Sequence, residues 1–442
     1  MSEFVRARNS TEVTWSLDPF TIVKPHDPRF ADIEKDLPRE HFGVSEPVRR
    51  IFGDPKRAPG QVKFGIIGHR GTGKSTLIRK AMDDLRPLGI MPVLVDALTS
   101  VDQTNFGLAD FMLVVVRSVI AELEAQQISL EPDVVETTYR WFADELISEQ
   151  SRKQIEASIE TSASAGVGFP SLAQFSAKLA SALKTDNEYR VEIRQRALRD
   201  VNDLLHRVNR VLDGAHAALA QRKQQLCVVF DNLEKVIDRE LVAKAVLVPA
   251  QEIRELRCHL VLFLHPADDY APTQIAASQC FRTIHVPALP VRFKGDDTDV
   301  VRPEAKRAIR RLLDARLELD GVFSDSDAAL DSLARLSGGN VRDVFRLVLR
   351  AAELAEPERI EVDHVARASV WLAGQRTPLM TAADWRRAVQ IDATKRVRNS
   401  QEDAHLLLHS CVLSYDGLPW WDVHPIVRAD PEFERVRLEL DE

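Results

Sequence analysis

Residues 68–76 read GHRGTGKST and lie between two segments of different character. The run before them, VKFGII (62–67), is apolar and β-branched, whereas LIRKAMDDL (77–85) has the apolar spacing of a helix. The pattern G-x-x-x-x-G-K-[ST] between a strand and a helix predicts a phosphate-binding loop. We expect its nine residues to line the site: Gly68, His69, Arg70, Gly71, Thr72, Gly73, Lys74, Ser75 and Thr76.

Each residue type in this loop suits a bound triphosphate. Glycines let backbone N–H groups turn toward the phosphates, and the following helix presents its positive amino end. Lys74 is expected to neutralise the β and γ oxygens, and the Ser75 hydroxyl to hold Mg²⁺. The sequence therefore predicts a site for a nucleoside triphosphate and magnesium.

A second candidate site element is LCVVFDNLEKV (226–236), an apolar run that ends in Asp231. A strand-terminal aspartate can simply form a turn, but at the carboxyl end of a parallel strand it would meet Ser75 and share the metal ion. The next residue is Asn232, an amide that cannot accept a proton at neutral pH. Glu234, two residues further along, is the alternative base. Because it is displaced from the position directly after Asp231, the sequence predicts slow hydrolysis of the nucleotide.

Short β-branched runs recur after residue 61, separated by helix-like segments. This alternation predicts an α/β fold with a parallel sheet covered on both faces. The expected strands are VKFGII (62–67), MPVLVDAL (91–98), QLCVVFDNL (225–233), CHLVLFLHP (258–266) and FRTIHVPAL (281–289).

The connection between the second and third expected strands is unusually long and mostly helical. In residues 189–223 one apolar face is expected to run along a single helix. This connection is either an inserted helical pair that offers a partner surface or a helix packed on its own sheet. The residues expected on the apolar face are Val191, Leu198, Val201, Leu205, Val208 and Leu212.

Composition limits the classes of function. The 442-residue chain is 45% hydrophobic and carries a net charge of -8, so it is not a general polyanion binder. The four cysteines lack metal-ligand or C-x-x-C spacing, and no apolar run reaches the length of a membrane span. We expect a cytoplasmic protein with no membrane contact.

Together, GHRGTGKS, VVFDNLE and LSGGNVRDVFRL (336–347) resemble the AAA+/STAND group of P-loop ATPases, closest to the origin-recognition-like and bacterial signalling branch. The resemblance covers roughly residues 60 to 355 and implies ATP and Mg²⁺ as ligands. It also implies a helical lid and, more loosely, a winged-helix tail. The oversized helical connection departs from simple origin-recognition ATPases.

The resemblance also implies roles for three further residues. Arg342 would reach from the lid to the γ-phosphate, although by itself it could be a surface arginine. His265, after the fourth strand, would sense the γ-phosphate, or it is a buried histidine satisfied by backbone. Arg282 would act on the nucleotide of the next subunit, or it is an ordinary arginine at a strand start.

The sequence is ambiguous about nucleic acid. Residues 401–442 hold ten acidic and three basic side chains, which disfavours DNA binding by the tail. The basic residues of 303–316 and 385–398 could contact phosphates, face solvent or contact another subunit. The aromatics Tyr415, Trp420 and Trp421 could stack on bases but are more often core at a helix–hairpin junction.

The resulting hypothesis is an ATP-operated switch whose partner protein or second copy contacts the helical insertion or the tail. A DNA-binding ATPase is the alternative. The expected units are an extended lead-in (1–60), a P-loop ATPase core (61–290) with an insertion at about 108–225, a helical lid (291–375) and a winged-helix-like module (376–442).

Overall fold

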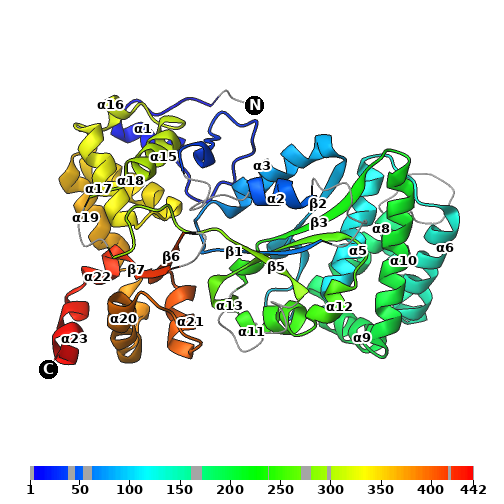
Figure 1. Ribbon diagram of the computed structural model, residues 1–442. Coiled ribbons are helices and arrows are strands. Elements are labelled where there is room, and N and C mark those ends of the chain that lie inside the picture. The colour runs from blue at the N-terminus through cyan, green and yellow to red at the C-terminus, as the bar shows by residue number, and fades with distance from the viewer. Residues whose placement is uncertain are drawn as a thin grey trace.

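A five-stranded parallel sheet forms the centre of the computed structural model (Figure 1). The structure describes residues 4–37, 45–52, 62–160, 172–236, 238–269, 280–295, 300–416 and 420–441. The strand order is β2-β3-β4-β1-β5, so β1 lies between β4 and β5. All five expected strands are present: β1 Lys63–Ile67, β2 Ile90–Asp96, β3 Gln225–Asp231, β4 His259–Leu264 and β5 Arg282–His285.

Alternate residues of the strands face two separate hydrophobic clusters, as the pleat requires. Phe64 of β1 and Phe263 of β4 belong to the cluster that contains α3 Lys74–Leu85. Leu226 and Phe230 of β3 belong to the other cluster, with α5 Leu108–Ala125 and α10 Val201–Ala220. The sheet is therefore covered on both faces, as the sequence predicts.

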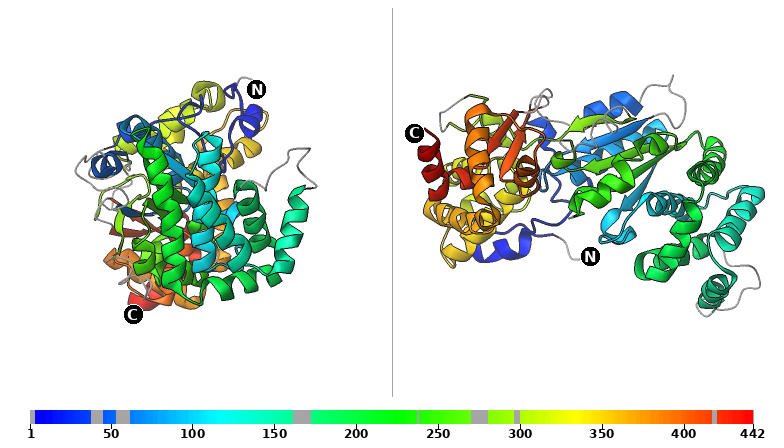
Figure 2. Two further views of the ribbon diagram at one scale, coloured as in Figure 1. Left: turned by 90° about the vertical axis from the view of Figure 1, so that its right-hand side faces the viewer. Right: turned by 90° about the horizontal axis from the view of Figure 1, so that it is seen from below.

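The long connection is a group of helices between β2 and β3 (Figure 2). Of these, α5 and α10 pack on the strands, while the others lie outside this pair. Helices of the connection therefore pack on the sheet of their own chain, and a partner surface on its outer helices stays a prediction. Its elements are α5 Leu108–Ala125, α6 Pro132–Arg140, the π-helical turn η3 Trp141–Glu145, α7 Glu149–Glu160, α8 Leu172–Thr185, α9 Asn187–Ala197 and α10 Val201–Ala220.

One expectation for this region is wrong. Residues 189–223 do not form a single helix, and Val191 and Leu198 are 45% and 41% exposed rather than buried. The Asp200 side chain accepts hydrogen bonds from the amides of Asn202 and Asp203, which caps α10 and separates it from α9. An N-cap aspartate favours a helix start strongly enough to interrupt the apolar period.

The remaining short elements lie between the longer ones: all but the last follow or join the strands, and the last joins the lid to the C-terminal module. They are η2 Arg86–Leu88, α4 Ala97–Ser100, η4 Leu233–Lys235, α11 Arg239–Val242, η5 Ala243–Leu247, α12 Ala250–Arg254, α13 Pro266–Asp269 and η6 Thr377–Leu379. In the described residues no helix is both long enough and apolar enough to cross a bilayer.

The lead-in is docked on both the core and the lid. Its elements are α1 Ser10–Ser16, η1 Ile33–Lys35 and α2 Ser45–Phe52. The amide of Ala7 donates to the carbonyl of Arg316 at 2.9 Å, which joins the lead-in to the lid. Lys80 of α3 bonds Glu34 at 2.8 Å, which joins it to the core.

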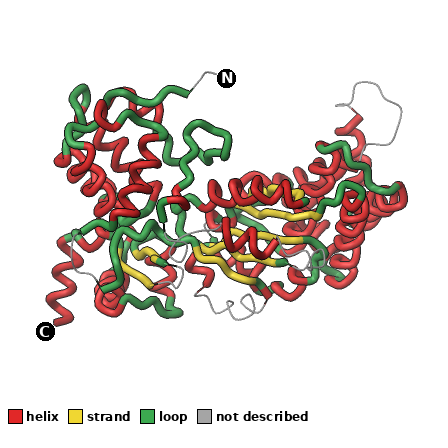
Figure 3. Tube along the Cα trace, turned by 45° about the horizontal axis from the view of Figure 1, so that its top comes forward, coloured by secondary structure: helices red, strands yellow, loops and turns green. Residues whose placement is uncertain are grey.

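The lid and the C-terminal module lie side by side, beyond the carboxyl ends of the strands (Figure 3). The lid comprises α15 Pro303–Asp314, α16 Leu319–Val322, α17 Ser326–Ser337, α18 Val341–Ala355 and α19 Val362–Ala373. The module comprises α20 Ala382–Thr394, α21 Gln401–Leu408, β6 Val412–Tyr415, β7 Trp420–Val423, α22 Pro425–Arg428 and α23 Pro431–Asp441.

The order of helices and antiparallel hairpin in the module agrees with the expected order. Tyr415, Trp420 and Trp421 are 0%, 4% and 3% exposed, so these aromatics are core residues. They cannot stack on bases without unfolding the hairpin.

Candidate nucleotide site

The loop of residues 68–76 joins β1 to α3 at the carboxyl edge of the sheet. Gly71 and Gly73 have φ values of +89° and +85°, which L-residues other than glycine rarely adopt. A Cβ at Gly68 would lie 2.5 Å from the carbonyl oxygen of Val286. The glycines of the motif are therefore required by backbone shape and by close approach. Thr72 bonds the His69 carbonyl at 3.1 Å and helps to fix the turn.

Lys74 is buried within this loop and directed along its inner side. Its Nζ donates to the carbonyl oxygens of Gly68 and His69 at 2.7 and 2.6 Å. Glu234 Oε1 lies 3.8 Å from the same nitrogen. Burial lowers the pKa of Lys74 to about 8, while the Glu234 charge acts in the opposite direction. The amine is thus held in a site that an additional anion would stabilise.

Ser75 and Asp231 meet as the sequence predicts. Ser75 Oγ donates to Asp231 Oδ1 at 2.9 Å. Burial raises the pKa of Asp231, and the neighbouring Glu234 charge raises it further. A hydroxyl and a carboxylate oxygen side by side are ligands that suit Mg²⁺, and a cation there would offset the cost of burying both carboxylates. The residues present therefore fit a magnesium ion.

The turn after β3 gives Asn232 a structural task. Its φ is +67°, and its side-chain amide donates to Asp96 Oδ1 at 2.7 Å. Glu234 is 2% exposed, and its Oε2 has no hydrogen-bond partner among the described residues. Arg70 bonds the carbonyl of Glu234 at 3.1 Å and fixes this turn against the loop. A buried carboxylate with one unpartnered oxygen is suited to accept a proton or a water hydrogen bond.

The lid turn 337–342 donates two hydrogen bonds to backbone carbonyls of the phosphate loop, one from a side chain and one from a backbone amide. Asn340 Nδ2 donates to the Arg70 carbonyl at 3.0 Å, and the Arg342 amide donates to the Gly71 carbonyl at 3.1 Å. The Arg342 guanidinium lies 5.3 Å from the Phe20 ring centroid, and its Nε has no partner among the described residues. Burial lowers the pKa of this guanidinium. Arg342 therefore lines the same pocket as Lys74, and its charge lowers the pKa of that amine.

His265 also lies at this edge, whereas Arg282 does not. His265 is 0% exposed, its Nδ1 accepts from the Ala267 amide at 3.1 Å, and its ring centroid is 5.8 Å from that of His69. Arg282 is exposed and pairs in register with Phe64, near the amino end of β1. Its side chain therefore starts at the end of the sheet away from the loop of its own chain.

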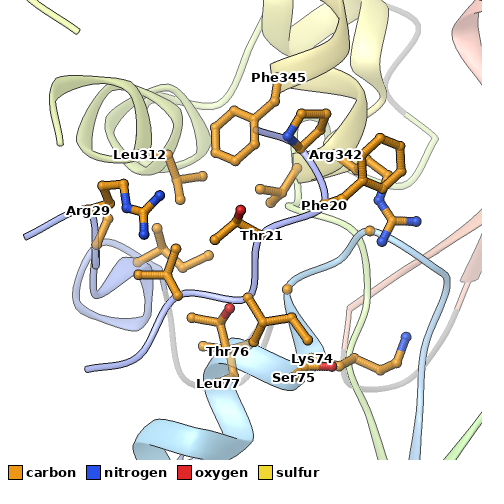
Figure 4. A pocket seen from close by; sticks show the side chains of 18 of the residues that line it. Phe20, Thr21, Arg29, Lys74, Ser75, Thr76, Leu77, Leu312, Arg342 and Phe345 are labelled. Atoms are coloured by element: carbon orange, nitrogen blue, oxygen red, sulfur yellow. The ribbon is translucent and has the colours of Figure 1, made fainter. Parts of the chain in front are cut away.

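A pocket continues from the phosphate loop between the lead-in and the lid (Figure 4). Thr21 of the lead-in lies between Ser75 and Thr76 on one side and Phe345 on the other. The pocket has the place and mixed lining expected for a base and ribose beside their phosphates. The lining residues that sequence reasoning did not identify include Phe20, Thr21, Ile22, Val23, Arg29, Leu312, Arg316 and Phe345.

No protein-family model and no curated protein sequence matches this chain. Among solved structures, Cdc6p from Pyrobaculum aerophilum aligns with 96% of this chain and 98% of its own, at 12% identity and a TM-score of 0.35. The Orc1 protein of Aeropyrum pernix, solved in complex with DNA, aligns with 98% and 96% at 14% identity and a TM-score of 0.36. The chemistry inferred below comes from this chain's own side chains.

Proposed function

We propose that this chain is an AAA+/STAND-like ATPase that works as a slow, ATP-operated switch. One observation carries the proposal: the lid turn is hydrogen-bonded to the loop that carries Lys74 and Ser75, and Ser75 in turn bonds Asp231 of β3. A triphosphate in the loop would therefore meet charges from both the core and the lid. Binding or loss of the phosphates would therefore change the contacts of the lid as well as those of the core.

The residues of the site divide the chemistry among them. Lys74 and Arg342 supply positive charge for the β and γ oxygens, and the loop amides orient them. Ser75 and Asp231 would hold Mg²⁺, which neutralises phosphate charge when bound. Glu234 accepts the proton of the attacking water, and His265 can donate from Nε2 because its Nδ1 already accepts the Ala267 amide.

Slow turnover follows from the position of the base. Asn232 stands directly after Asp231 and is committed to Asp96, so it neither takes a proton nor moves freely. Glu234 lies one turn further along and is drawn toward Lys74. Arg282 is available to the site of a second copy, and an arginine supplied in trans can raise phosphoryl-transfer rates by ~10³ or more.

Nucleotide state would be passed to a partner protein or to further copies of the chain. The outer helices of the insertion and the C-terminal module are the surfaces we assign to such contacts, since α5 and α10 are committed to the sheet. A role in bacterial signalling or defence, in the cytoplasm, is the setting we propose. The winged-helix assignment and the domain limits given above remain part of this proposal.

The alternative is a DNA-binding ATPase. The basic helix α15 offers little free charge for it, because three of its cations already pair with acids. Lys306 bonds Asp327 at 2.7 Å, Arg310 lies 3.2 Å from the same residue, and Arg311 pairs with Asp36. Arg387 is buried against Asp403. A polyanion would have to displace these partners, so we favour a protein partner.

Steady-state phosphate release from Mg-ATP, with and without duplex DNA at low salt, tests this proposal, with Lys74→Ala as the blank. Slow release above the blank that ignores DNA supports the switch. Release raised several-fold by DNA would favour the alternative, and that gain should then fall on reversing the charges at 307, 310 and 311. Release equal to the blank, with ATP bound, would make the protein a nucleotide-binding scaffold.

A further inference from the structure

His69, the second residue of the phosphate loop, points away from the loop and into the C-terminal module. Its side chain is 0% exposed. The amide of Ser414 in β6 donates to its Nε2 at 3.2 Å, over 345 residues of sequence. The Trp421 ring of β7 lies 6.1 Å from the imidazole, edge to face.

Groups of the module and of the loop also determine the protonation state of His69. Burial lowers its pKa to about 3, and the Lys74 charge lowers it further, while the backbone of Leu407 in α21 acts in the opposite direction. The imidazole is therefore neutral, and accepting the Ser414 amide at Nε2 leaves the proton on Nδ1. Nε2 is thus engaged by the module rather than by the phosphate cradle, while Nδ1 is buried and has no hydrogen-bond partner among the described residues.

The hairpin that receives His69 is itself anchored to the segments that surround the nucleotide site. The carbonyl of Ser414 accepts the amide of Ala288 at 2.9 Å, just beyond β5. Tyr415 Oη donates to the carbonyl of Gly338 in the lid turn at 2.7 Å. A Cβ at Gly338 would lie 2.8 Å from Pro425 and 2.9 Å from Leu413, so module and lid turn are in close contact.

The His69 ring also lies against His265, the histidine at the end of β4. The ring centroids of His69 and His265 are 5.8 Å apart with an interplanar angle of 89°. His265 begins the turn that forms α13, and α13 packs against α21 of the module. The imidazole of His69 therefore lies between the loop, the end of β4 and the hairpin.

We propose that His69 is a positioning residue that makes the C-terminal module a structural part of the nucleotide site. The module, through the Ser414 amide, holds the loop in the shape that receives phosphates. By reciprocity, phosphates that fix the loop also fix the hairpin. This inference rests on the proposed nucleotide binding, and it identifies how the tail receives the nucleotide signal.

Hydrogen–deuterium exchange of the full-length protein, with and without Mg-ATP, tests this coupling at residues 412–415. In the wild type we expect slower exchange there when ATP binds. His69→Leu fills the same space without an acceptor, so it should lose the ATP-induced slowing and weaken ATP binding about tenfold, the size expected for one lost positioning contact. His69→Gln offers an acceptor oxygen to Ser414 and should restore most of both effects.

The outcomes separate the two claims. ATP binding that leaves exchange at 412–415 unchanged in the wild type overturns the coupling, even if no variant folds. Undiminished slowing in His69→Leu also overturns it. Failure of the wild type to bind ATP overturns the proposed function and, with it, the coupling. Faster ligand-free exchange at 412–415 in His69→Leu would still verify that His69 holds the Ser414 amide.

Discussion

The amide of Arg342 donates a hydrogen bond of 3.1 Å to the carbonyl oxygen of Gly71. This contact joins the first turn of the lid helix α18 to the middle of the phosphate loop. Since Asn340 bonds the preceding carbonyl, at Arg70, two successive carbonyls of the loop are held by the lid. The lid therefore cannot move away without exposing the loop that binds phosphate.

Gly71→Ala should separate the lid from the loop. A Cβ there would lie 2.5 Å from Asn340 Oδ1 and 2.6 Å from Arg342 Cβ, on a backbone with φ of +89°. Gly73→Ala is the matched control, because its φ is +85° but no atom lies within 4 Å of the added carbon. Left-handed strain costs both variants about 1–2 kcal/mol, and only Gly71→Ala adds the clash. Denaturant unfolding of both variants measures the difference, and equal losses would contradict the proposed lid contact.

Glu234→Gln should lower the rate of ATP hydrolysis and leave ATP binding nearly intact. Loss of a positioned general base costs about 10²–10⁴ in rate. The exposed Glu240→Gln, in the next helix α11, is the matched control. Asn232→Glu should not raise the rate, because the new carboxylate loses the bond to Asp96 and faces its charge. Single-turnover hydrolysis and equilibrium ATP binding check both points. A faster Asn232→Glu enzyme would show that the base belongs at position 232.

Thr21→Trp should block the base pocket without affecting the phosphate loop. Thr21 is exposed on the lead-in and faces the pocket between Ser75 and Phe345. We expect ATP affinity to fall at least about tenfold, roughly the 1.4 kcal/mol of one well-placed contact, while inorganic triphosphate binds as before. Thr14→Trp, exposed on α1 and outside the pocket lining, is the control. Equal loss of ATP and triphosphate would place the base elsewhere.

Stability should fall as the pH is lowered from about 6.5 to 5. Burial lowers the pKa of His424 to about 4 and of His69 to about 3, and it lowers that of His265 well below the usual value. In this pH window the unfolded chain binds protons that the folded chain does not. Stability is therefore present above the unfolded pKa and lost on acidification, by about 1.4 kcal/mol per pH unit for each histidine.

The pH effect is checked by urea unfolding at pH 7, 6 and 5. His424→Gln removes one titrating group and should reduce the slope of stability against pH by about one proton. Only the slope is compared, because the substitution also changes the contact of His424 with Asp343 at 3.4 Å. An unchanged slope would show that His424 is not a buried neutral histidine.

The sequence predicts most of the core and only part of the site. The β-branched runs are local patterns and predict the five strands, while the loop motif and the strand-terminal Asp231 predict the pairing of Ser75 with Asp231. The lid turn is similarly local, whereas the reach of Arg342 to a γ-phosphate stays a prediction. The single helix expected for residues 189–223 fails because the cap at Asp200 outweighs a weak apolar period.

Other features depend on contacts between distant segments and have no local sequence pattern. Thr21 lines the pocket only because the lead-in is held by Lys80 and by the lid. His69 looks like one variable position of the motif, yet it is inserted into a hairpin more than 300 residues away. In the sequence, Asn232 stands where a catalytic base would be expected. In the structure, its side chain instead donates a hydrogen bond to Asp96.

Hydrogen–deuterium exchange of the wild-type protein with and without Mg-ATP tests the central claim most directly, when exchange is followed in the loop 68–76, the lid turn 337–342 and the lead-in 19–23. Lys74→Ala at the same ATP concentration is the blank. A nucleotide held between core, lid and lead-in should slow exchange in all three segments in the wild type and in none of them in the blank. Slowing confined to the loop, or equal in the blank, would contradict a nucleotide that bridges core and lid.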